Sequence, residues 1–512
     1  MITFYTEKPY PQRNVIFLWH DNWDDYSFKT LYSLSYYDNN GVVTPLGNVK
    51  IGQKKLEVGT PNLPTKFTEL NESFFSLGMD VEYYSNIKNL GLELREYILQ
   101  SLNDVAFDDK ILEEAMTESC MITSLMRGVT YPLIVGQFKR VAHGGDVLSE
   151  YKFTYTYPLT IKGRDNKSPQ LNFHVIPESN PPTNIHIIIG SNGVGKTFLI
   201  NNMIKVLLEP TNTFFIDDTT IEGDSSIGKF SFEFSELYGE TSSFVNIISV
   251  AFSAFDNTEV HPNREADKNK IGYSYVGLKK KLSKNDLFQH KTTEELEEDF
   301  YISLMECKAN DSKRSRWLQM ISILESDPLI LSLGIRNNID YDNGNIAKES
   351  FAKLSSGHKI IILTVTKLVE LTVEKSLIIL DEPESHLHPP LLSSFIRAIS
   401  ELMIQMNAVA IIATHSPVVI QEVPKKCVWK ISRNGEITNI ERVEVETFGE
   451  NVGLLTNEIF GLEVTSAGFY KMLQVVVEES DSYEDAKEKF DGELGGEAMA
   501  ILRNMMHLKS QK

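Results

Sequence analysis

The feature that most constrains this chain is an eight-residue phosphate-loop motif at positions 190–197. It reads Gly-Ser-Asn-Gly-Val-Gly-Lys-Thr and follows the short apolar run Ile185–Ile189. Glycines let such a loop turn so that successive backbone amides converge on phosphate oxygens, and the positive end of a following helix also favours an anion. The lysine places a charge on the β- and γ-phosphates, and the threonine hydroxyl is a ligand for Mg²⁺. We therefore expect nucleotide contacts from Gly190, Ser191, Asn192, Gly193, Val194, Gly195 and Lys196, and a metal contact from Thr197.

A second apolar run, Leu377–Leu380, ends in two adjacent carboxylates, Asp381 and Glu382. A strand here would deliver both acids beside the place where the phosphate loop must emerge. Asp381 is expected to hold Mg²⁺ directly or through water. Glu382 is expected to point to the other side and polarise the attacking water, which makes it a candidate catalytic base beside Lys196.

Two further segments carry candidate phosphate ligands. The apolar run Val409–Ala413 is followed by Thr414-His415-Ser416, and a histidine at the end of a core strand can reach and sense a γ-phosphate. The segment Ser355-Ser356-Gly357 begins an apolar helix, where the helix amino end offers a second anion site. A serine-glycine helix start is also a common helix cap, so this second pattern alone is weak.

The spacing of these runs predicts an α/β core with a mainly parallel sheet. Short β-branched strands with polar carboxyl ends, separated by helical patterns, are typical of doubly wound folds. We expect an α+β accessory domain over residues 1–150, with a strand over Tyr26–Tyr36 and a helix over Val81–Leu102. The ATPase head is expected over 151–450. Residues 205–345 are expected as a short helical lid insertion, and 451–512 as a helical, acidic tail.

Composition limits the functional classes. The 512 residues carry 50 Lys+Arg against 70 Asp+Glu, a formal charge of −20. A protein that coats nucleic acid needs the opposite balance, so contact would require a local basic patch such as Lys279–Lys281 or Lys313–Arg316. No apolar run approaches the roughly 18 residues of a membrane span, and the start shows no signal-peptide pattern. Three cysteines cannot form a disulfide framework, which favours a reducing, cytoplasmic location.

In their order along the chain, these motifs resemble those of the ABC-type ATPases, in the SMC/RecF/OLD-like branch. The run Asp381–Pro389, the segment Leu354–Gly357 and the triplet Thr414–Ser416 carry the resemblance. It implies an ABC-type head that binds ATP and Mg²⁺ and hydrolyses ATP. It also implies a head-to-head dimer, in which Ser355 and Gly357 of one subunit cap the γ-phosphate held by Lys196 of the other.

Two positions depart from the family pattern, since Ser356 replaces the second glycine and His358 stands where glutamine or glutamate is commoner. His386 and His388 suggest zinc by their spacing. However, no third ligand is expected nearby and the family run accounts for both histidines, so we predict no zinc site.

The two ends of the chain are also similar to ATPases from bacterial anti-phage defence operons, such as the Septu-type ATPases, which act beside an HNH nuclease. The first hypothesis is accordingly an ATP-dimerised sensor or scaffold that regulates a separate nuclease or toxin in antiviral defence. The alternative is a RecF-like DNA repair ATPase. A transporter cassette is disfavoured by the long N-terminal extension, and an α/β protein that binds ATP without hydrolysing it stays open.

Overall fold

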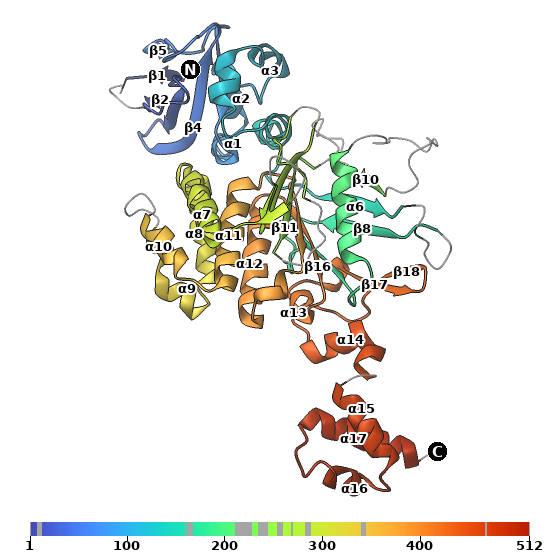
Figure 1. The fold of residues 1–512 in the computed structure, drawn as a ribbon. Helices are drawn as coiled ribbons and strands as arrows, with labels where there is room; N and C mark the ends of the chain where they lie inside the picture. Colours follow the sequence, from blue (N-terminus) through green and yellow to red (C-terminus); the bar gives the residue numbers. More distant parts are fainter. Residues whose placement is uncertain are drawn as a thin grey trace.

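Three units follow one another along the chain (Figure 1). They are an N-terminal unit of sheet and helices, a central α/β unit and a small C-terminal helical unit, and each has its own buried hydrophobic cluster. The computed structural model describes residues 2–7, 13–158, 161, 167–209, 228–233, 244–252, 260–267, 270–281, 288–338, 345–465 and 468–510.

The central unit is built on a seven-stranded sheet in the order β12-β11-β15-β16-β9-β17-β18. Every neighbouring pair is parallel except β17 with β18. The prediction of an α/β core with a mainly parallel sheet is therefore confirmed. In chain order the strands are β9 (Ile185–Ile189), β11 (Asn246–Ala251), β12 (Gly272–Gly277), β15 (Leu377–Asp381), β16 (Val409–Thr414), β17 (Val428–Asn434) and β18 (Ile437–Arg442).

Both faces of this sheet are covered, because successive side chains of each strand enter different hydrophobic clusters. Ile378 of β15 packs in the cluster that contains Trp317 and Phe395 from the helical side, whereas Ile379 packs in the cluster that contains Leu199. The first face carries α7 (Thr293–Lys308), α8 (Asp311–Leu324), α11 (Ser356–Leu371) and α12 (Pro389–Gln405). The second carries α6 (Lys196–Leu208) and the antiparallel sheet of β7 (Tyr151–Thr156), β8 (Gln170–Val175) and β10 (Lys229–Glu233).

The range 205–345, expected as a lid, is only partly helical. Strands β11 and β12 lie inside this range and belong to the central sheet. The reason is the apolar run Ile247–Ala251, which is buried in the sheet. The helical part consists of α7, α8, α9 (Pro328–Leu333) and the 3-10 turn η3 (Ile335–Asn338), and α7 begins at a capping box made by Thr292 and Glu295. The hairpin β13 (Lys279–Lys281) with β14 (Phe288–His290) precedes it, and α10 (Asn345–Ala352) follows it.

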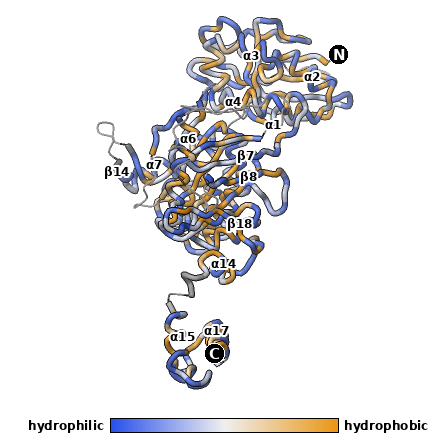
Figure 2. Tube along the Cα trace, turned by 90° about the vertical axis from the view of Figure 1, so that its right-hand side faces the viewer, coloured by the Kyte–Doolittle hydropathy of each residue, from blue (hydrophilic) through white to orange (hydrophobic). Residues whose placement is uncertain are grey.

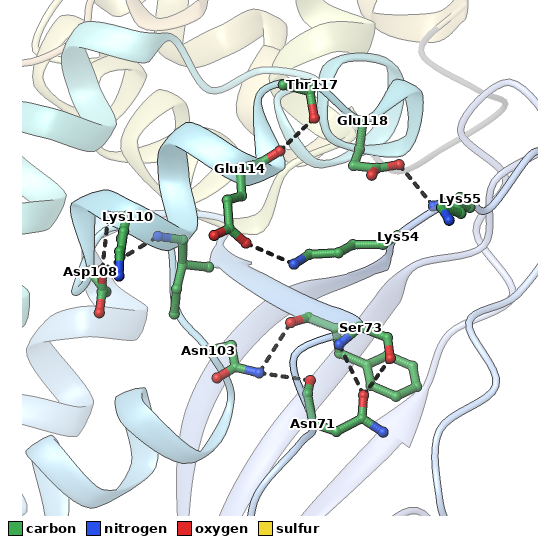
Figure 3. Close-up of polar contacts among 12 residues, drawn as sticks. Lys54, Lys55, Asn71, Ser73, Asn103, Asp108, Lys110, Glu114, Thr117 and Glu118 are labelled. Carbon is green, nitrogen blue, oxygen red and sulfur yellow. Dashed lines mark hydrogen bonds and ion pairs between the residues drawn. The ribbon is translucent and has the colours of Figure 1, made fainter.

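The N-terminal unit contains a six-stranded sheet in the order β5-β1-β2-β3-β4-β6, covered by short helices. Its elements are β1 (Thr3–Tyr5), β2 (Val15–His20), β3 (Leu31–Tyr37), β4 (Val43–Gln53), β5 (Lys66–Phe67), β6 (Phe74–Gly78), α1 (Val81–Lys88), α2 (Leu92–Ser101), α3 (Asp109–Ala115), η1 (Met121–Leu125), α4 (Tyr131–Leu133), η2 (Ile134–Phe138) and α5 (Lys139–Ala142). Polar contacts tie the helices to the sheet (Figure 3): Lys54 pairs with Glu114 at 2.8 Å, and the Asn103 amide donates to the Phe74 carbonyl at 3.1 Å.

Two predicted elements of this unit differ from the structure. The strand expected from Tyr26 begins only at Leu31, because Tyr26 and Ser27 adopt φ values of 51° and 75° and form a turn. The helix expected over Val81–Leu102 is two helices, because Gly91 adopts a φ of 97° between α1 and α2. A periodic apolar pattern continued through both breaks, so periodicity alone could not locate them.

The C-terminal unit is helical. Helix α14 (Val452–Thr465) leads away from the central unit into α15 (Gly468–Glu478), α16 (Tyr483–Glu488) and α17 (Gly496–Ser510) (Figure 2). Five buried residues form its core: Leu473, Val477, Ala486, Leu502 and Met506. Among the described helices of the whole chain, none combines the length and apolar character that crossing a membrane demands.

A buried ion pair joins the N-terminal unit to the central sheet. Arg140 of α5 donates to the carboxylate of Glu374, and the two side chains are 5% and 4% exposed. Glu374 also accepts from the Asn407 amide at 3.1 Å and lies just before β15. Burial raises the pKa of Glu374 from its ordinary value, and the Arg140 charge opposes that rise. Loss of either partner would therefore leave the other charged group buried without its counter-ion.

Replacing Arg140 by Ala should lower the free energy of unfolding by about 3–5 kcal/mol, because it leaves a buried carboxylate without its counter-ion. The neighbouring Lys139 is a matched control. It pairs with Asp109 at 2.7 Å, but that carboxylate is 65% exposed, so Lys139→Ala should cost at most about 1 kcal/mol. Denaturant unfolding of both variants tests this, and equal losses would contradict it.

Candidate functional site

The carboxyl ends of three neighbouring strands meet at one edge of the central sheet. Strand β16 lies between β15 and β9, with Asp381 beside Ala413 and Thr414 beside Ile189. Each strand is followed directly by one of the predicted motifs. The sheet order therefore brings the acidic pair, the histidine and the phosphate loop together, although they are far apart in the sequence.

The phosphate loop connects β9 to α6, and its glycines are required by its backbone. Gly193 and Gly195 adopt φ values of 80° and 101°, in the left-handed region that favours glycine. Gly190 approaches β17 so closely that a Cβ atom there would lie 2.2 Å from the Ile431 carbonyl oxygen. The loop therefore needs glycine at these three positions to make its turn before α6.

Lys196 is held inside this loop. Its Nζ donates to the carbonyl oxygens of Gly190 at 3.0 Å and Ser191 at 3.2 Å, and its side chain is 5% exposed. The same Nζ lies 3.8 Å from Oε1 of Glu382. The loop's own carbonyls and one carboxylate thus keep the ammonium group next to the phosphate-binding backbone.

Thr197 and Asp381 are joined directly. The Thr197 Oγ1 donates to Oδ2 of Asp381 at 2.8 Å, and Asp381 is 5% exposed. A hydroxyl and a carboxylate in contact form the kind of oxygen donor set that Mg²⁺ prefers. These two residues, predicted from separate motifs, fit a magnesium ion.

Glu382 is turned toward both neighbouring motifs. Its backbone adopts φ 44° and ψ 58°, and its N–H donates to the Ala413 carbonyl at 2.9 Å. This left-handed conformation breaks the strand immediately after Asp381. The Glu382 Oε1 consequently lies 3.8 Å from Nζ of Lys196 and 3.6 Å from Nδ1 of His415, and the side chain is 31% exposed.

Glu384 is the residue at this site to which the sequence analysis gave no role. Its Oε1 accepts from Oγ1 of Thr414 at 2.5 Å and from the His415 N–H at 2.8 Å, and lies 3.2 Å from Nδ1 of His415. The Glu384 side chain is only 8% exposed. It fixes the backbone of His415 and lies beside its ring. The sequence feature that could have indicated Glu384 is an acidic residue two positions after Glu382. Residues 383–386 form a 3-10 turn, which brings this acidic side chain back to β16.

The signature segment, Ser355-Ser356-Gly357, lies at the amino end of α11. Its two serines are exposed and Gly357 is buried. A Cβ atom on Gly357 would lie 2.5 Å from the His386 carbonyl oxygen, so glycine is needed for α11 to pack on the turn that follows Glu382. The Ser355 hydroxyl contacts Nδ1 of His358 at 2.5 Å. The segment is thus anchored to the acidic-pair loop while its serines face outward.

The expectation that His388 lacks a further potential ligand nearby is wrong. Tertiary packing brings His358 of α11 and Asp327, which precedes α9, next to His388, and their ligand atoms lie within 4.8 Å of one another. Asp327 and His358 precede His388 by 61 and 30 positions, so their approach depends on how α8, α9, α11 and α12 pack together. His386 is not part of this group.

Comparison with known families identifies the central segment. Residues 185–421 match the family model described as "AAA domain, putative AbiEii toxin, Type IV TA system". This range contains all of the site residues described above, from the phosphate loop to His415.

A relative in a bacteriophage matches nearly the whole chain. Protein ea59 of Escherichia phage lambda is 39% identical over 523 residues, covering 97% of this chain and 96% of its own length.

Solved structures with similar heads are more distant. The SMC head domain from Thermotoga maritima is 15% identical with a TM-score of 0.31, covering 58% of this chain and 99% of its own. The cbiO1 component of an ABC transporter complex from Clostridium perfringens is 16% identical with a TM-score of 0.28, covering 61% and 94%.

The family assignment rests on the first two matches, and the site geometry agrees with it. The chain belongs to the family of phage lambda protein ea59, and its central unit is an AAA-type P-loop ATPase domain.

Proposed function

We propose that this protein is a Mg²⁺-dependent ATPase whose copies associate head to head around ATP and regulate a separate effector. The observation that carries the ATPase part is the meeting of Lys196, the Thr197–Asp381 pair and Glu382 at one sheet edge. These groups provide, within a few ångströms, a phosphate charge, a metal-binding oxygen pair and a carboxylate base.

Each residue then has a defined role. The amides of residues 190–195 and the Lys196 ammonium bind the triphosphate, with Nζ exchanging its carbonyl partners for phosphate oxygens. Thr197 and Asp381 would hold Mg²⁺, which when bound would neutralise charge on the β- and γ-phosphates. Glu382 accepts the proton of the attacking water, and His415, held by Glu384, contacts the γ-phosphate.

Self-association is supported by the position of the signature segment. Ser355 and Ser356 are exposed at the amino end of α11, where the helix dipole favours an anion. The Ser355 hydroxyl contacts His358, and the neighbouring Gly357 packs against the His386 carbonyl, which leaves the outward side of the serines open to a partner. A second copy would bring its ATP γ-phosphate to this helix end.

The regulatory part of the proposal is supported by the extra N-terminal unit, which has its own core and a buried link to β15. The matching family model is described as a putative toxin of a type IV toxin–antitoxin system, which links the family to such systems and names no separate effector. We infer that this protein and its separate effector act together in antiviral defence. A nuclease or toxin encoded next to this gene would support it. DNA or RNA degradation by the purified chain alone would contradict a separate effector.

The RecF-like alternative requires a basic surface for duplex DNA. One candidate patch is poorly available, because Lys313 is partly buried and its Nζ donates to the Glu370 carbonyl at 2.8 Å. The other contains Lys280, which pairs with Glu295. With the net charge of −20, these contacts favour the effector proposal. ATP-dependent, salt-sensitive gel shifts with duplex DNA would favour the alternative.

Replacing Lys196 by Ala should weaken ATP binding by at least about tenfold to a hundredfold, because it removes charge-assisted hydrogen bonds worth about 1.5–3 kcal/mol. Lys205→Ala, in the last turn of the same helix, is the control and should bind normally. Titration calorimetry with a non-hydrolysable ATP analogue measures both. Equal affinities would remove Lys196 from the site.

Replacing Glu382 by Gln should keep nucleotide binding while lowering kcat by about 10²–10⁴-fold, because the amide cannot accept the water proton. The stalled protein should accumulate as a dimer on a sizing column with ATP and Mg²⁺. Glu436→Gln, at an exposed turn, is the control. Normal turnover in Glu382→Gln would exclude the proposed base.

Replacing Ser355 by Arg should leave ATP binding to the monomer intact but block the ATP-dependent dimer, because a bulky side chain would occupy the space of the partner's phosphate. Ser510→Arg, an exposed serine at the end of α17, is the matched control. Sedimentation in the Glu382→Gln background measures the dimer. Unchanged association of the Ser355 variant would contradict capping by the second copy.

A further inference from the structure

The Ser355 hydroxyl makes a different hydrogen bond from the one that is usual for a serine at the start of a helix. A serine at this position normally accepts a hydrogen bond from a backbone amide of the first turn. Ser355 is the N-cap of α11 and makes no such bond. Its Oγ instead lies 2.5 Å from Nδ1 of His358, whose Nε2 lies 3.3 Å from Oδ1 of Asp327. A continuous serine–histidine–aspartate chain therefore ends at the exposed signature segment.

Asp327 is the fixed, negatively charged end of this series of hydrogen-bonded side chains. It is the N-cap of α9 and accepts from the amides of Leu329 at 2.9 Å and Ile330 at 3.2 Å. Burial by itself would raise the pKa of Asp327, but these two amides and His358 outweigh it and hold the pKa below its ordinary value. Asp327 is thus a carboxylate at neutral pH, and a carboxylate can only accept hydrogen bonds.

The direction of the protons follows from that carboxylate. His358 must present a proton on Nε2, so in the neutral ring Nδ1 is an acceptor and the Ser355 O–H donates to it. The hydroxyl proton is then unavailable to a phosphate. In the protonated ring Nδ1 donates to Ser355 Oγ instead, and the Ser355 proton becomes free to donate outward. The charge state of the His358 ring therefore decides whether the Ser355 hydroxyl proton is directed at His358 or outward.

His388 indicates that protons, not a metal ion, hold this cluster together. Its Nδ1 accepts from the Leu391 N–H at 3.2 Å, so the neutral ring carries its proton on Nε2. That Nε2 lies 3.5 Å from Oδ2 of Asp327. A metal ion on this nitrogen would need its lone pair there, and the ring would then direct an Nδ1 proton at the Leu391 amide.

Among the described residues, the other charged groups near the Ser355–His358–Asp327 series are already paired or offer no competing base. Lys359, which follows His358 on α11, pairs with Glu297 of α7 at 2.9 Å. His388, at the amino end of α12, shares the Asp327 carboxylate with His358. Lys353, after α10, is exposed. Asp327 is therefore the carboxylate that faces the His358 ring.

We propose that protonation of His358, with Asp327 as its counter-ion, frees the Ser355 hydroxyl to donate to the γ-phosphate of ATP held by the second copy. Head-to-head joining then takes up a proton at each signature segment. His358 and Asp327 are positioning residues in this scheme, since they act through Ser355. The inference rests on the proposed head-to-head dimer and adds a proton requirement to it.

The test is the association constant of the Glu382→Gln protein with ATP and Mg²⁺, measured by sedimentation between pH 6 and pH 8.5. Association should tighten as pH falls, by up to about tenfold per pH unit for each histidine that takes up a proton. ATP itself also takes up a proton in this range, so the relevant quantity is the part of the slope that depends on His358.

In the same background, His358→Asn should lose that part of the slope yet retain association, because the Asn amide is a donor at every pH. His358→Leu should also lose that part of the slope while retaining association, because no ring nitrogen remains to accept the Ser355 proton. Asp327→Asn should shift the rise to lower pH, because the counter-charge is lost while asparagine still caps α9. His174→Asn is the matched control, since His174 is an exposed histidine paired with Glu150 at 2.7 Å and should keep the full slope.

An unchanged slope in His358→Asn would overturn this inference while leaving the dimer intact. A stoichiometric transition metal ion that is lost in His388→Ala would also overturn it, because the ion would replace the protons. Absence of ATP-dependent association in every variant at every pH would instead contradict the proposed function itself.

Discussion

The burial of one parallel sheet on both faces is the constraint on which the site depends. Polar side chains that must reach a ligand can be placed only at the strand ends, because both faces are filled by helices and a second sheet. Strand β16 separates β15 from β9 by one position, so three polar strand ends meet at the same edge. The site is therefore a consequence of strand order.

Within that edge, the main chain aims the charged groups. The left-handed turn at Glu382 directs its carboxylate toward Lys196 and His415. The turn after it returns Glu384 to the backbone of His415, where it accepts the N–H. Side chains of opposite charge are thus held near one another by short turns, and a nucleotide can replace some of their contacts without a change in the sheet.

Strand β15 also connects the site with the rest of the molecule. Its carboxyl end carries the acidic pair, and its amino end follows Glu374, which pairs with Arg140 of the N-terminal unit. Beyond the acidic pair, the chain contacts Gly357 of the signature segment through the His386 carbonyl. A displacement of the N-terminal unit or of the signature segment would therefore act on a segment connected to β15. The N-terminal unit is thus joined to the strand that carries the acidic pair.

The sequence by itself determined what depends on short, contiguous patterns. The loop at 190–197, the acids at 381–382 and the histidine at 415 were each recognisable, because their chemistry needs fixed neighbours and apolar strands before them. The parallel core sheet followed from those same apolar runs. Only the tertiary structure decided that β11 and β12 join this sheet, that Glu384 holds His415, and that Asp327 meets His358. These outcomes depend on packing between distant segments, which no local periodicity encodes.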